Sequence, residues 1–484
     1  MKMTVTFWKR VFDLSIGIFF AQVFAIASVP IISRLYLPND YGTLGLFNAI
    51  SGVAYVIAAL RYEKAIIIAE EHEVPSLLRL SSIFIIVFSF VFFLLLLLVG
   101  EVLAKFAGIQ EAVSFEVYLC ISVFLNGWLL LFLSLGNRKK TYRLLAIAIA
   151  LQSIVSNLLK ILLGFSFPPQ AHYLILSELI GVIFATLFLV FRLGLGSFKE
   201  LAGTTKYSNP YLVAKRYRKF FRYDVVNSFL TSSSWLLPII VMSLFFTTAE
   251  VGYYVFAYSI LRIPINLIGK SAEDVFYRQA SGISDQSKLT EVTSAILWSL
   301  IRVSFLPLTA ILLLGDVFFQ MVFGIQWGTA GELAMILSPL AFMWFLSLPV
   351  TTLFNTLQKQ EKLLSFVISG TILRIAALII GGMYENLYFA VLLFSISSII
   401  VYFFQFSAIF GLIGYSLKSF FSSGKSGSAD LLKACLAGVV FYILPLPDEY
   451  TVPIVVCIFF YFEFKLVMRE FAEYKNHDPK TESL

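Results

Sequence analysis

The chain has 484 residues, of which 59% are hydrophobic and 13% are charged, and its mean hydropathy is +0.88. Soluble domains carry about twice that charged fraction. Long apolar runs also recur along the whole sequence, so the composition excludes an ordinary soluble protein. The net charge of +7 is concentrated in the segments between these runs and is better explained by membrane topology than by nucleic-acid binding.

The apolar runs are about twenty residues long and lack strict alternation, which favours membrane-spanning helices over barrel strands. A backbone in lipid must satisfy its own hydrogen bonds, and a helix does so within one segment. In chain order the expected helices are 11–35, 40–60, 77–99, 113–135, 143–164, 171–194, 222–246, 250–270, 292–314, 332–357, 362–382, 386–412, 430–446 and 451–468. The sequence therefore predicts an all-α polytopic membrane protein of about fourteen helices.

Lysine and arginine are distributed unevenly between the two sides of this membrane domain. With the N-terminus in the cytoplasm, thirty of the 36 lie in or beside cytoplasmic segments. The opposite side holds only Arg34 and Lys105, and the other four lie within helices. Because basic residues mark cytoplasmic loops, both termini are expected there. The largest cluster, Lys215-Arg216-Tyr217-Arg218-Lys219, could also hold anionic lipid headgroups.

The two halves of the chain repeat at an offset of 210 positions. Asp40-Tyr41-Gly42 begins the second expected helix and Glu250-Val251-Gly252 begins the eighth, while Glu63 and Glu273 follow these helices. Six helices in each half make the repeats parallel, an organisation typical of transporters. The expected domains are a six-helix lobe at 1–194, a basic cytoplasmic linker at 195–221, a second six-helix lobe at 222–412, a flexible linker at 413–429, helices thirteen and fourteen at 430–468 and a cytoplasmic tail at 469–484.

Four cations inside expected helices are the clearest functional signal, namely Lys160, Arg262, Arg302 and Arg374. Each costs roughly 2.5–3.5 kcal/mol near the centre of a membrane helix, so they should face protein or water. Polar residues at helical spacing predict further cavity lining, namely Gln152, Asn227, Thr231, Tyr254, Tyr258 and Asn355. The alternative is that such polar stripes are helix–helix packing. A cavity rich in cations would bind an anion such as a phosphate or pyrophosphate.

Acids and prolines inside the helices suggest how such a cavity could work. Glu178 could titrate and couple transport to ions, or it could only neutralise a cation such as Lys160. Asp13 is the second candidate for ion coupling, or it is simply solvated near the cytoplasmic surface. Pro30 and Pro238 interrupt the first and seventh helices at nearly matching places and are the expected hinges. The cysteines form no CxxC pair and the histidines lie far apart, so neither a metal nor a cofactor is expected.

Several motifs in the first seventy residues point to one family. They are Pro30-Ile31-Ile32-Ser33-Arg34-Leu35-Tyr36-Leu37-Pro38, then Asp40-Tyr41-Gly42, then Leu60-Arg61-Tyr62-Glu63-Lys64-Ala65-Ile66. The chain resembles the bacterial polysaccharide flippases, the O-antigen and exopolysaccharide-unit translocases (Wzx type) of the multidrug/oligosaccharidyl-lipid/polysaccharide exporter superfamily. The resemblance marks Arg34, Asp40, Gly42, Arg61 and Glu63 as motif residues, whose role could be structural.

This resemblance implies two six-helix lobes around a central cavity that works by alternating access. It implies a substrate of oligosaccharide linked to undecaprenyl pyrophosphate, moved from the cytoplasmic to the periplasmic leaflet of the bacterial inner membrane. Related lipid II flippases carry basic residues on helix one, whereas here that helix has Asp13 and Gln22, which argues against lipid II itself. Membrane lipids, a polysaccharide polymerase and a chain-length regulator are the expected partners of a monomer.

Two other functions are alternatives to translocation. A multidrug antiporter of the same superfamily would share the fold, but it exports organic cations and should have an acidic or aromatic cavity. A glycan polymerase or ligase would be an enzyme with a substantial periplasmic segment, and the longest expected periplasmic loop is under about twenty residues. A transport protein without enzymatic activity is therefore expected.

Overall fold

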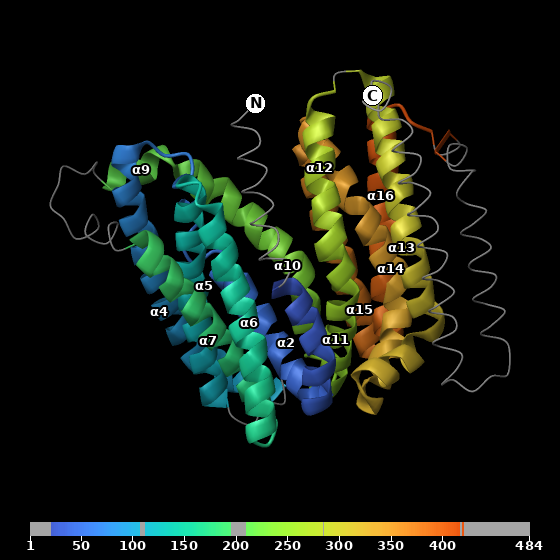
Figure 1. Ribbon diagram of the computed structural model, residues 1–484, viewed down its shortest axis with the longest axis horizontal. Coiled ribbons are helices and arrows are strands. Elements are labelled where there is room, and N and C mark those ends of the chain that lie inside the picture. Colours follow the sequence, from blue (N-terminus) through green and yellow to red (C-terminus); the bar gives the residue numbers. More distant parts are fainter. Residues whose placement is uncertain (1–20, 107–111, 195–209, 284, 417–418, 421–484) are drawn as a thin grey trace, which may run out of the picture. The chain divides into compact units, whose positions relative to one another are not determined.

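The computed structural model describes residues 21–106, 112–194, 210–283, 285–416 and 419–420 (Figure 1). The described residues form helices and turns, and no β-strand occurs among them. In this part of the chain, ten helices are long and apolar enough to cross a membrane, and Ala21–Leu35 is a shorter apolar helix. The all-α polytopic architecture is thus confirmed. The expected helices 430–446 and 451–468, the tail at 469–484 and most of the linker at 413–429 lie outside the described residues.

The described helices follow the expected order. The first half comprises α2 (Pro38–Tyr55), α3 (Tyr62–Ala65), α4 (Val74–Phe106), α5 (Ala112–Arg138), α6 (Tyr142–Ser166) and α7 (Ala171–Leu189), which ends in the π-helical turn Val190–Gly194. The next segment comprises α9 (Pro210–Arg216), the π-helical turn Phe220–Asp224 and α10 (Val225–Met242). The remainder comprises α11 (Thr248–Pro264), the π-helical turn Ile265–Gly269, α12 (Lys270–Ser281), α13 (Gln286–Phe323), α14 (Gly328–Thr356), α15 (Gln360–Met383) and α16 (Leu387–Leu412).

The expected helix 40–60 is shorter in the structure. It ends at Tyr55, and the chain continues in turns, where the Ala58 N–H donates to the Tyr55 carbonyl at 3.2 Å, until Leu60 and Arg61 adopt left-handed backbone angles with φ of 49° and 61°. Non-glycine residues rarely adopt such angles, and an α-helix cannot continue through them. At the corresponding place in the second half, 210 positions later, helix α11 passes into its π-helical turn Ile265–Gly269. Both repeats therefore depart from regular α-helix at the same point.

The expected helix 292–314 is longer in the structure, where α13 runs for 38 residues. Leu314 within it has non-helical angles with φ of −131°, seven positions after Pro307.

Pro238, one of the expected hinges, lies inside α10 and is buried. Pro30, the other, lies within the continuous helix Ala21–Leu35.

The chain divides into two compact units, residues 1–255 and 256–484. The boundary between these units lies within α11. The expected division into six-helix lobes at 1–194 and 222–412 stays a prediction. Helix α10 belongs to the first unit because it packs against α2. Residues 248–255, at the start of α11, are in the first unit as well, and the contact that joins them to α2 is described with the site.

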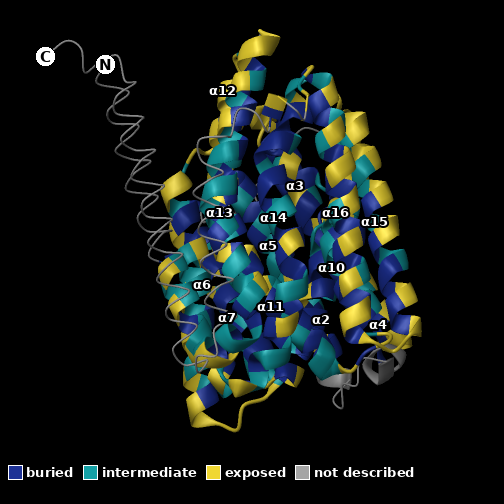
Figure 2. Ribbon diagram, turned by 90° about the vertical axis from the view of Figure 1, so that its right-hand side faces the viewer, coloured by how far each residue is buried: buried dark blue, intermediate teal, exposed yellow. Residues whose placement is uncertain are grey.

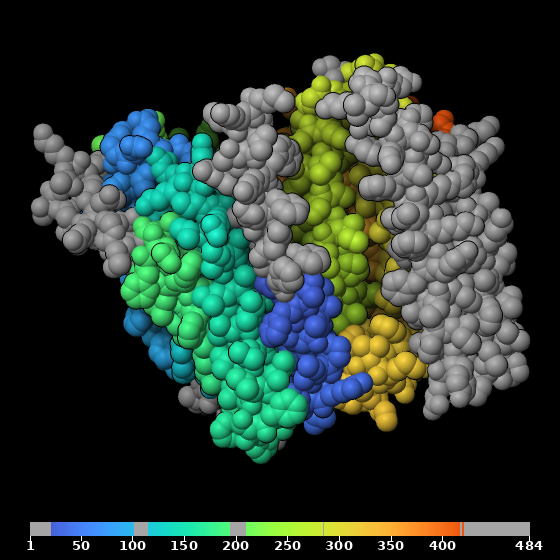
Figure 3. Space-filling model, in the orientation of Figure 1, coloured from blue at the N-terminus to red at the C-terminus, as the bar shows by residue number. Residues whose placement is uncertain are grey.

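Each unit is organised around a few well-buried helices. In the first unit α5 packs against α4, α7 and α2. Helix α6 lies beside α7 on the face that Figure 3 shows. In the second unit α14 packs against α13, α16 and α12. In the most apolar stretch of α14, 67% of the residues are buried, whereas in that of α15 only 22% are. Helix α15 accordingly shows many exposed residues (Figure 2). The outer helices therefore present apolar side chains outward, as expected for a protein in lipid.

Candidate functional site

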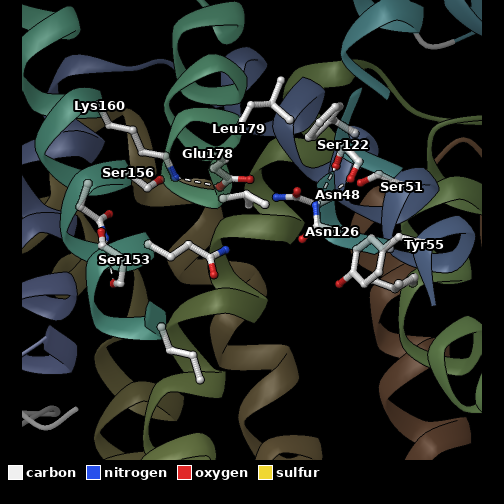
Figure 4. Close-up of a pocket in the computed structure, with 17 residues that line it drawn as sticks. Asn48, Ser51, Tyr55, Ser122, Asn126, Ser153, Ser156, Lys160, Glu178 and Leu179 are labelled. Carbon is white, nitrogen blue, oxygen red and sulfur yellow. Dashed lines mark hydrogen bonds and ion pairs between the residues drawn. The ribbon is translucent and has the colours of Figure 1, made fainter. Parts of the chain in front are cut away.

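Polar side chains from four helices meet in a cavity of about 550 Å³ inside the first unit (Figure 4). Helices α2, α5, α6 and α7 all contribute to its wall. The polar residues that line it are Asn48, Ser51, Tyr55, Ser122, Asn126, Gln152, Ser153, Ser156, Asn157, Lys160 and Glu178. A pocket of this size could hold one or two sugar rings or a pyrophosphate group.

Helical spacing explains how this wall forms. On α6, Gln152, Ser156 and Lys160 recur at steps of four, and steps of three to four place side chains on one face of a helix. Some of the polar groups are satisfied locally, as when the Asn126 amide donates to the Ser122 carbonyl at 2.9 Å. Asn48 and Gln152 make no side-chain hydrogen bond to any described residue, so their amides are available to a ligand.

Lys160 and Glu178 form an ion pair across this pocket. The Lys160 Nζ atom lies 2.8 Å from Glu178 Oε1, and the two side chains are 12% and 26% exposed. The Tyr36 hydroxyl donates to the Lys160 carbonyl at 2.9 Å, which ties α6 to the end of the first described helix. Glu178 thus neutralises Lys160 in this structure, while its role in ion coupling stays a prediction. Asp13, the other candidate for coupling, lies outside the described residues.

The three arginines of the second unit lie in different surroundings. Arg262 is exposed on α11. Arg302 lines a pocket of about 500 Å³ on α13, together with Trp298 and Tyr415 among others. Arg374 is only 5% exposed between α15 and α16, where its Nε donates to Ser398 Oγ at 2.9 Å and its guanidinium lies 5.8 Å from the Tyr402 ring. The setting of Arg374 is that of helix–helix packing, the alternative considered from the sequence.

We expect alanine substitutions at Arg374 and Arg302 to act through different steps. Arg374→Ala removes a buried hydrogen bond and a cation–π contact, which should lower the free energy of unfolding by about 2–4 kcal/mol and deplete the protein from the membrane. Arg302→Ala should leave membrane abundance unchanged, because Arg302 lines a pocket and not a buried contact between α15 and α16. Immunoblots of membrane fractions separate the two results. Normal abundance of Arg374→Ala would show that its buried hydrogen bond and ring contact are dispensable for folding.

The remaining residues expected to line a cavity are dispersed. Gln152 lines the first-unit pocket, whereas Asn227 and Thr231 are exposed on α10 and Asn355 is exposed on α14. Tyr254 is 1% exposed, so it belongs to the packed interior and not to a cavity wall. The Tyr258 ring stacks on Trp344 with 5.7 Å between ring centroids. Tyr254 and Tyr258 were expected to line a cavity because they lie four residues apart on α11. Residues that only pack against a neighbouring helix follow the same spacing.

The motif residues stabilise turns. The Asp40 carboxylate accepts a hydrogen bond from the Leu37 backbone N–H at 2.9 Å and caps α2. Arg61 pairs with Glu63 at 3.3 Å and with Asp224 at 3.0 Å, which holds the left-handed turn after α2 against the start of α10. Glu63 is buried. Arg34 is exposed.

The repeat seen in the sequence appears in the structure as a reciprocal contact. A Cβ atom added to Gly42 would lie 1.8 Å from the Thr248 carbonyl oxygen, and one added to Gly252 would lie 1.8 Å from the Pro38 carbonyl oxygen. Gly252 lies 210 positions after Gly42, and Thr248 lies 210 positions after Pro38, so the two contacts are related by the repeat. Glu250 also repeats the cap of Asp40, since it accepts from the Thr247 N–H at 2.8 Å. The N-terminal ends of α2 and α11 therefore touch backbone to backbone through two glycines.

Sequence reasoning missed most of the first-unit pocket. Asn48, Ser51 and Tyr55 on α2 and Ser122 and Asn126 on α5 were not singled out, although they too follow steps of three and four. This spacing could have indicated a polar helix face, but in α2 small residues follow the same spacing and indicate helix packing equally well. Ser, Asn and Tyr are also individually common in membrane helices, so only their convergence identifies a site.

Known structures share this fold. The lipid II flippase MurJ in an inward closed conformation has a TM-score of 0.74 at 13% identity, covering 96% of this chain and 99% of that one. An inward-facing multidrug resistance transporter of the MATE family, in the MOP superfamily, has a TM-score of 0.65 at 16% identity, covering 84% and 96%. A MOP superfamily transporter from Pyrococcus furiosus has a TM-score of 0.56 at 13% identity, covering 83% and 94%.

At such identities these similarities concern the fold. A comparison with curated protein sequences finds no match. A family model described as "Polysaccharide biosynthesis protein" matches residues 31–332. Because that match spans more than half of the chain, the protein belongs to this family of polysaccharide biosynthesis proteins.

Proposed function

We propose that this protein translocates oligosaccharide repeat units linked to undecaprenyl pyrophosphate, for O-antigen or exopolysaccharide, by alternating access. Translocation would run from the cytoplasmic to the periplasmic leaflet of the bacterial inner membrane, with both chain termini in the cytoplasm. The observation that carries the proposal is the polar pocket inside a membrane domain of a polysaccharide biosynthesis family. Buried polar groups in membrane helices are costly, so their convergence indicates a ligand or a water-filled path.

The composition of the pocket suits a glycan attached to a phosphate. The Asn48 and Gln152 amides can each donate to and accept from sugar hydroxyls, and Tyr55 adds an aromatic ring. The Lys160 ammonium can bind a phosphate oxygen. It would then have to separate from Glu178, which lies 2.8 Å away.

This competition suggests where transport could be coupled to ions. A substrate phosphate that takes the lysine leaves the Glu178 carboxylate without its partner in a largely buried position. Glu178 is therefore the residue to which we assign ion coupling. The four cations need not meet at one point for this scheme.

An exporter of organic cations is the second candidate, because transporters of the MATE family share the fold. The family assignment favours the glycan. The pocket also has one acid, Glu178, and that acid is paired with a lysine, which leaves little net charge to attract a cation. The relatives with this fold are named as flippases and transporters, which agrees with a transport function and not with a polymerase or ligase.

The test is deletion of the gene in its own host, followed by analysis of surface polysaccharide and of undecaprenyl-linked intermediates. We expect loss of the polymer and accumulation of lipid-linked repeat units on the cytoplasmic leaflet, restored by the wild-type chain. Unchanged polysaccharide with altered sensitivity to cationic drugs would support the second candidate. The same strain allows co-purification with the polymerase and the chain-length regulator, and we expect the protein to act as a monomer.

A further inference from the structure

A polar stripe runs along the segment that leads into α10. Lys219, Tyr223, Asn227 and Thr231 follow one another at steps of four, and all four are exposed. The first three line a pocket of about 370 Å³ together with Phe220 and Asp224. The stripe thus begins in the basic segment beside the membrane and continues onto a helix that crosses it.

Contacts on the opposite face hold this segment in place. Val213 and Tyr217 are buried, and the Tyr217 hydroxyl donates to Glu73 Oε2 at 2.7 Å. Arg216 pairs with Glu73 at 2.8 Å and with Glu70 at 2.6 Å, which fixes α9 to the start of α4. Burial and the hydrogen bond to Glu73 raise the pKa of the Tyr217 phenol, so it stays a donor at neutral pH. The stripe is therefore presented by an anchored segment.

Three polar side chains of this pocket make no polar contact with the rest of the described protein. The Lys219 ammonium, the Tyr223 hydroxyl and the Asn227 amide make no hydrogen bond or ion pair with any described residue. The neighbouring acid, Asp224, is paired with Arg61 at 3.0 Å, so it does not neutralise Lys219. An uncommitted cation, phenol and amide around one pocket fit a ligand that carries both a phosphate and hydroxyl groups.

The surroundings add a positive field. Lys215, Arg218 and Arg222 are exposed on the same segment and are not paired with a described acid. The Tyr211 and Tyr223 rings are 71% and 65% exposed, and tyrosine favours the interface between membrane and water. Basic residues at this interface attract anionic lipid phosphates by about 1 kcal/mol each. In a lipid-linked glycan the pyrophosphate joins an apolar tail to a polar sugar, so the same interface suits it.

We propose that Lys219, Tyr223 and Asn227 form a docking site for the pyrophosphate–sugar junction of the lipid-linked substrate at the cytoplasmic leaflet. This inference rests on the proposed function and adds a second site to the pocket that contains Lys160. Lys219 binds the phosphate, and Tyr223 and Asn227 contact the first sugar. Thr231 marks the direction in which the stripe continues along α10.

The test measures binding of undecaprenyl pyrophosphate to the full-length protein in nanodiscs of zwitterionic lipid, with phosphatidylglycerol as the competing phosphate. The variants are Lys219→Gln and Asn227→Ala, and because undecaprenyl pyrophosphate carries no sugar, we expect Asn227→Ala to leave its binding unchanged. Lys215→Gln is the matched control, because Lys215 is exposed on the same segment but does not line the pocket. We expect Lys219→Gln to weaken binding about tenfold or more, since hydrogen bonds to charged groups are worth that much, and Lys215→Gln to change it less than about twofold.

Two results would overturn the docking site while leaving the proposed function intact, provided that the deletion strain loses its polysaccharide. One is an equal loss of binding in the Lys219 and Lys215 variants, which would indicate general attraction of anionic lipid. The other is displacement of undecaprenyl pyrophosphate by equimolar phosphatidylglycerol, which would assign the pocket to phospholipid headgroups. If the wild-type chain binds no undecaprenyl pyrophosphate and its deletion leaves the polysaccharide unchanged, both proposals fail.

Discussion

Replacing Gly42 with alanine should abolish polysaccharide export. The added Cβ would lie 1.8 Å from the Thr248 carbonyl oxygen, and that atom is backbone, which cannot turn aside as a side chain can. Forcing extra atoms into a packed contact costs about 1–3 kcal/mol or more, and here α2 and α11 would have to separate. Gly252→Ala should have the same effect through the Pro38 carbonyl oxygen, because the contact is reciprocal.

Two glycines provide controls for this prediction. Gly411, near the end of α16, has no atom within 4 Å of an added Cβ, so Gly411→Ala should be neutral. At Gly127 the nearest atom is a methyl group of the Ile85 side chain at 3.0 Å, so Gly127→Ala should have a smaller effect than Gly42→Ala. Export is measured as surface polysaccharide in the deletion strain, and thermal unfolding is measured on purified protein. Normal export and unfolding of Gly42→Ala would show that the close approach of the two helices is dispensable.

Breaking the Lys160–Glu178 pair should have the second large effect. Lys160→Ala or Glu178→Ala leaves a mostly buried charge without its partner, which should lower the free energy of unfolding by about 1–3 kcal/mol after allowing for its partial exposure. Each single variant should therefore be depleted from the membrane and export little polysaccharide. Membrane abundance and export are measured in the same cells.

The double variant Lys160→Met/Glu178→Leu separates structure from transport. Replacing a buried pair by apolar residues of similar size is often neutral for stability, so membrane abundance should return to the wild-type level. Export should not return, because the pocket then lacks both the cation proposed for phosphate and the acid proposed for ion coupling. Export at the wild-type level in this variant would show that the ion pair serves helix packing and not transport. Glu70→Gln is a control at an exposed pair, because Arg216 keeps its contact with Glu73 there, and it should change neither measurement.

The reciprocal glycine contact and the pocket lie in one unit, so the alternating access that we propose would involve this contact. Residues 248–255 of the second repeat belong to the first unit, together with α10 and the α2 glycines. A change of access that moves one repeat against the other would have to act on this backbone contact. The two acids that cap α2 and α11, Asp40 and Glu250, keep the helix ends regular where they meet.

Much of the fold could be predicted from the sequence because its signals are local. Lipid allows only segments that satisfy their own hydrogen bonds, so the apolar runs located the described helices to within a few residues at most ends. The offset of 210 positions predicted both helix starts, and in the structure Asp40 and Glu250 each accept a backbone hydrogen bond there. The turns between Tyr55 and Tyr62 were not predicted, because left-handed angles at Leu60 and Arg61 are not typical of those residue types.

The sequence by itself determined the membrane class, the helix order, the internal repeat and the presence of polar residues inside the helices. Only the tertiary structure decided which of those residues meet. It paired Lys160 with Glu178, buried Arg374 against Ser398, placed Arg302 on a pocket of its own and joined Asn48 on α2 to the wall formed by α6. The reason is physical: hydrophobicity and helical period act along one segment, whereas a side chain's partner depends on the rotation of each helix about its own axis. Packing between helices sets that rotation, and a helix face that is polar for packing has the same spacing as one that is polar for a substrate.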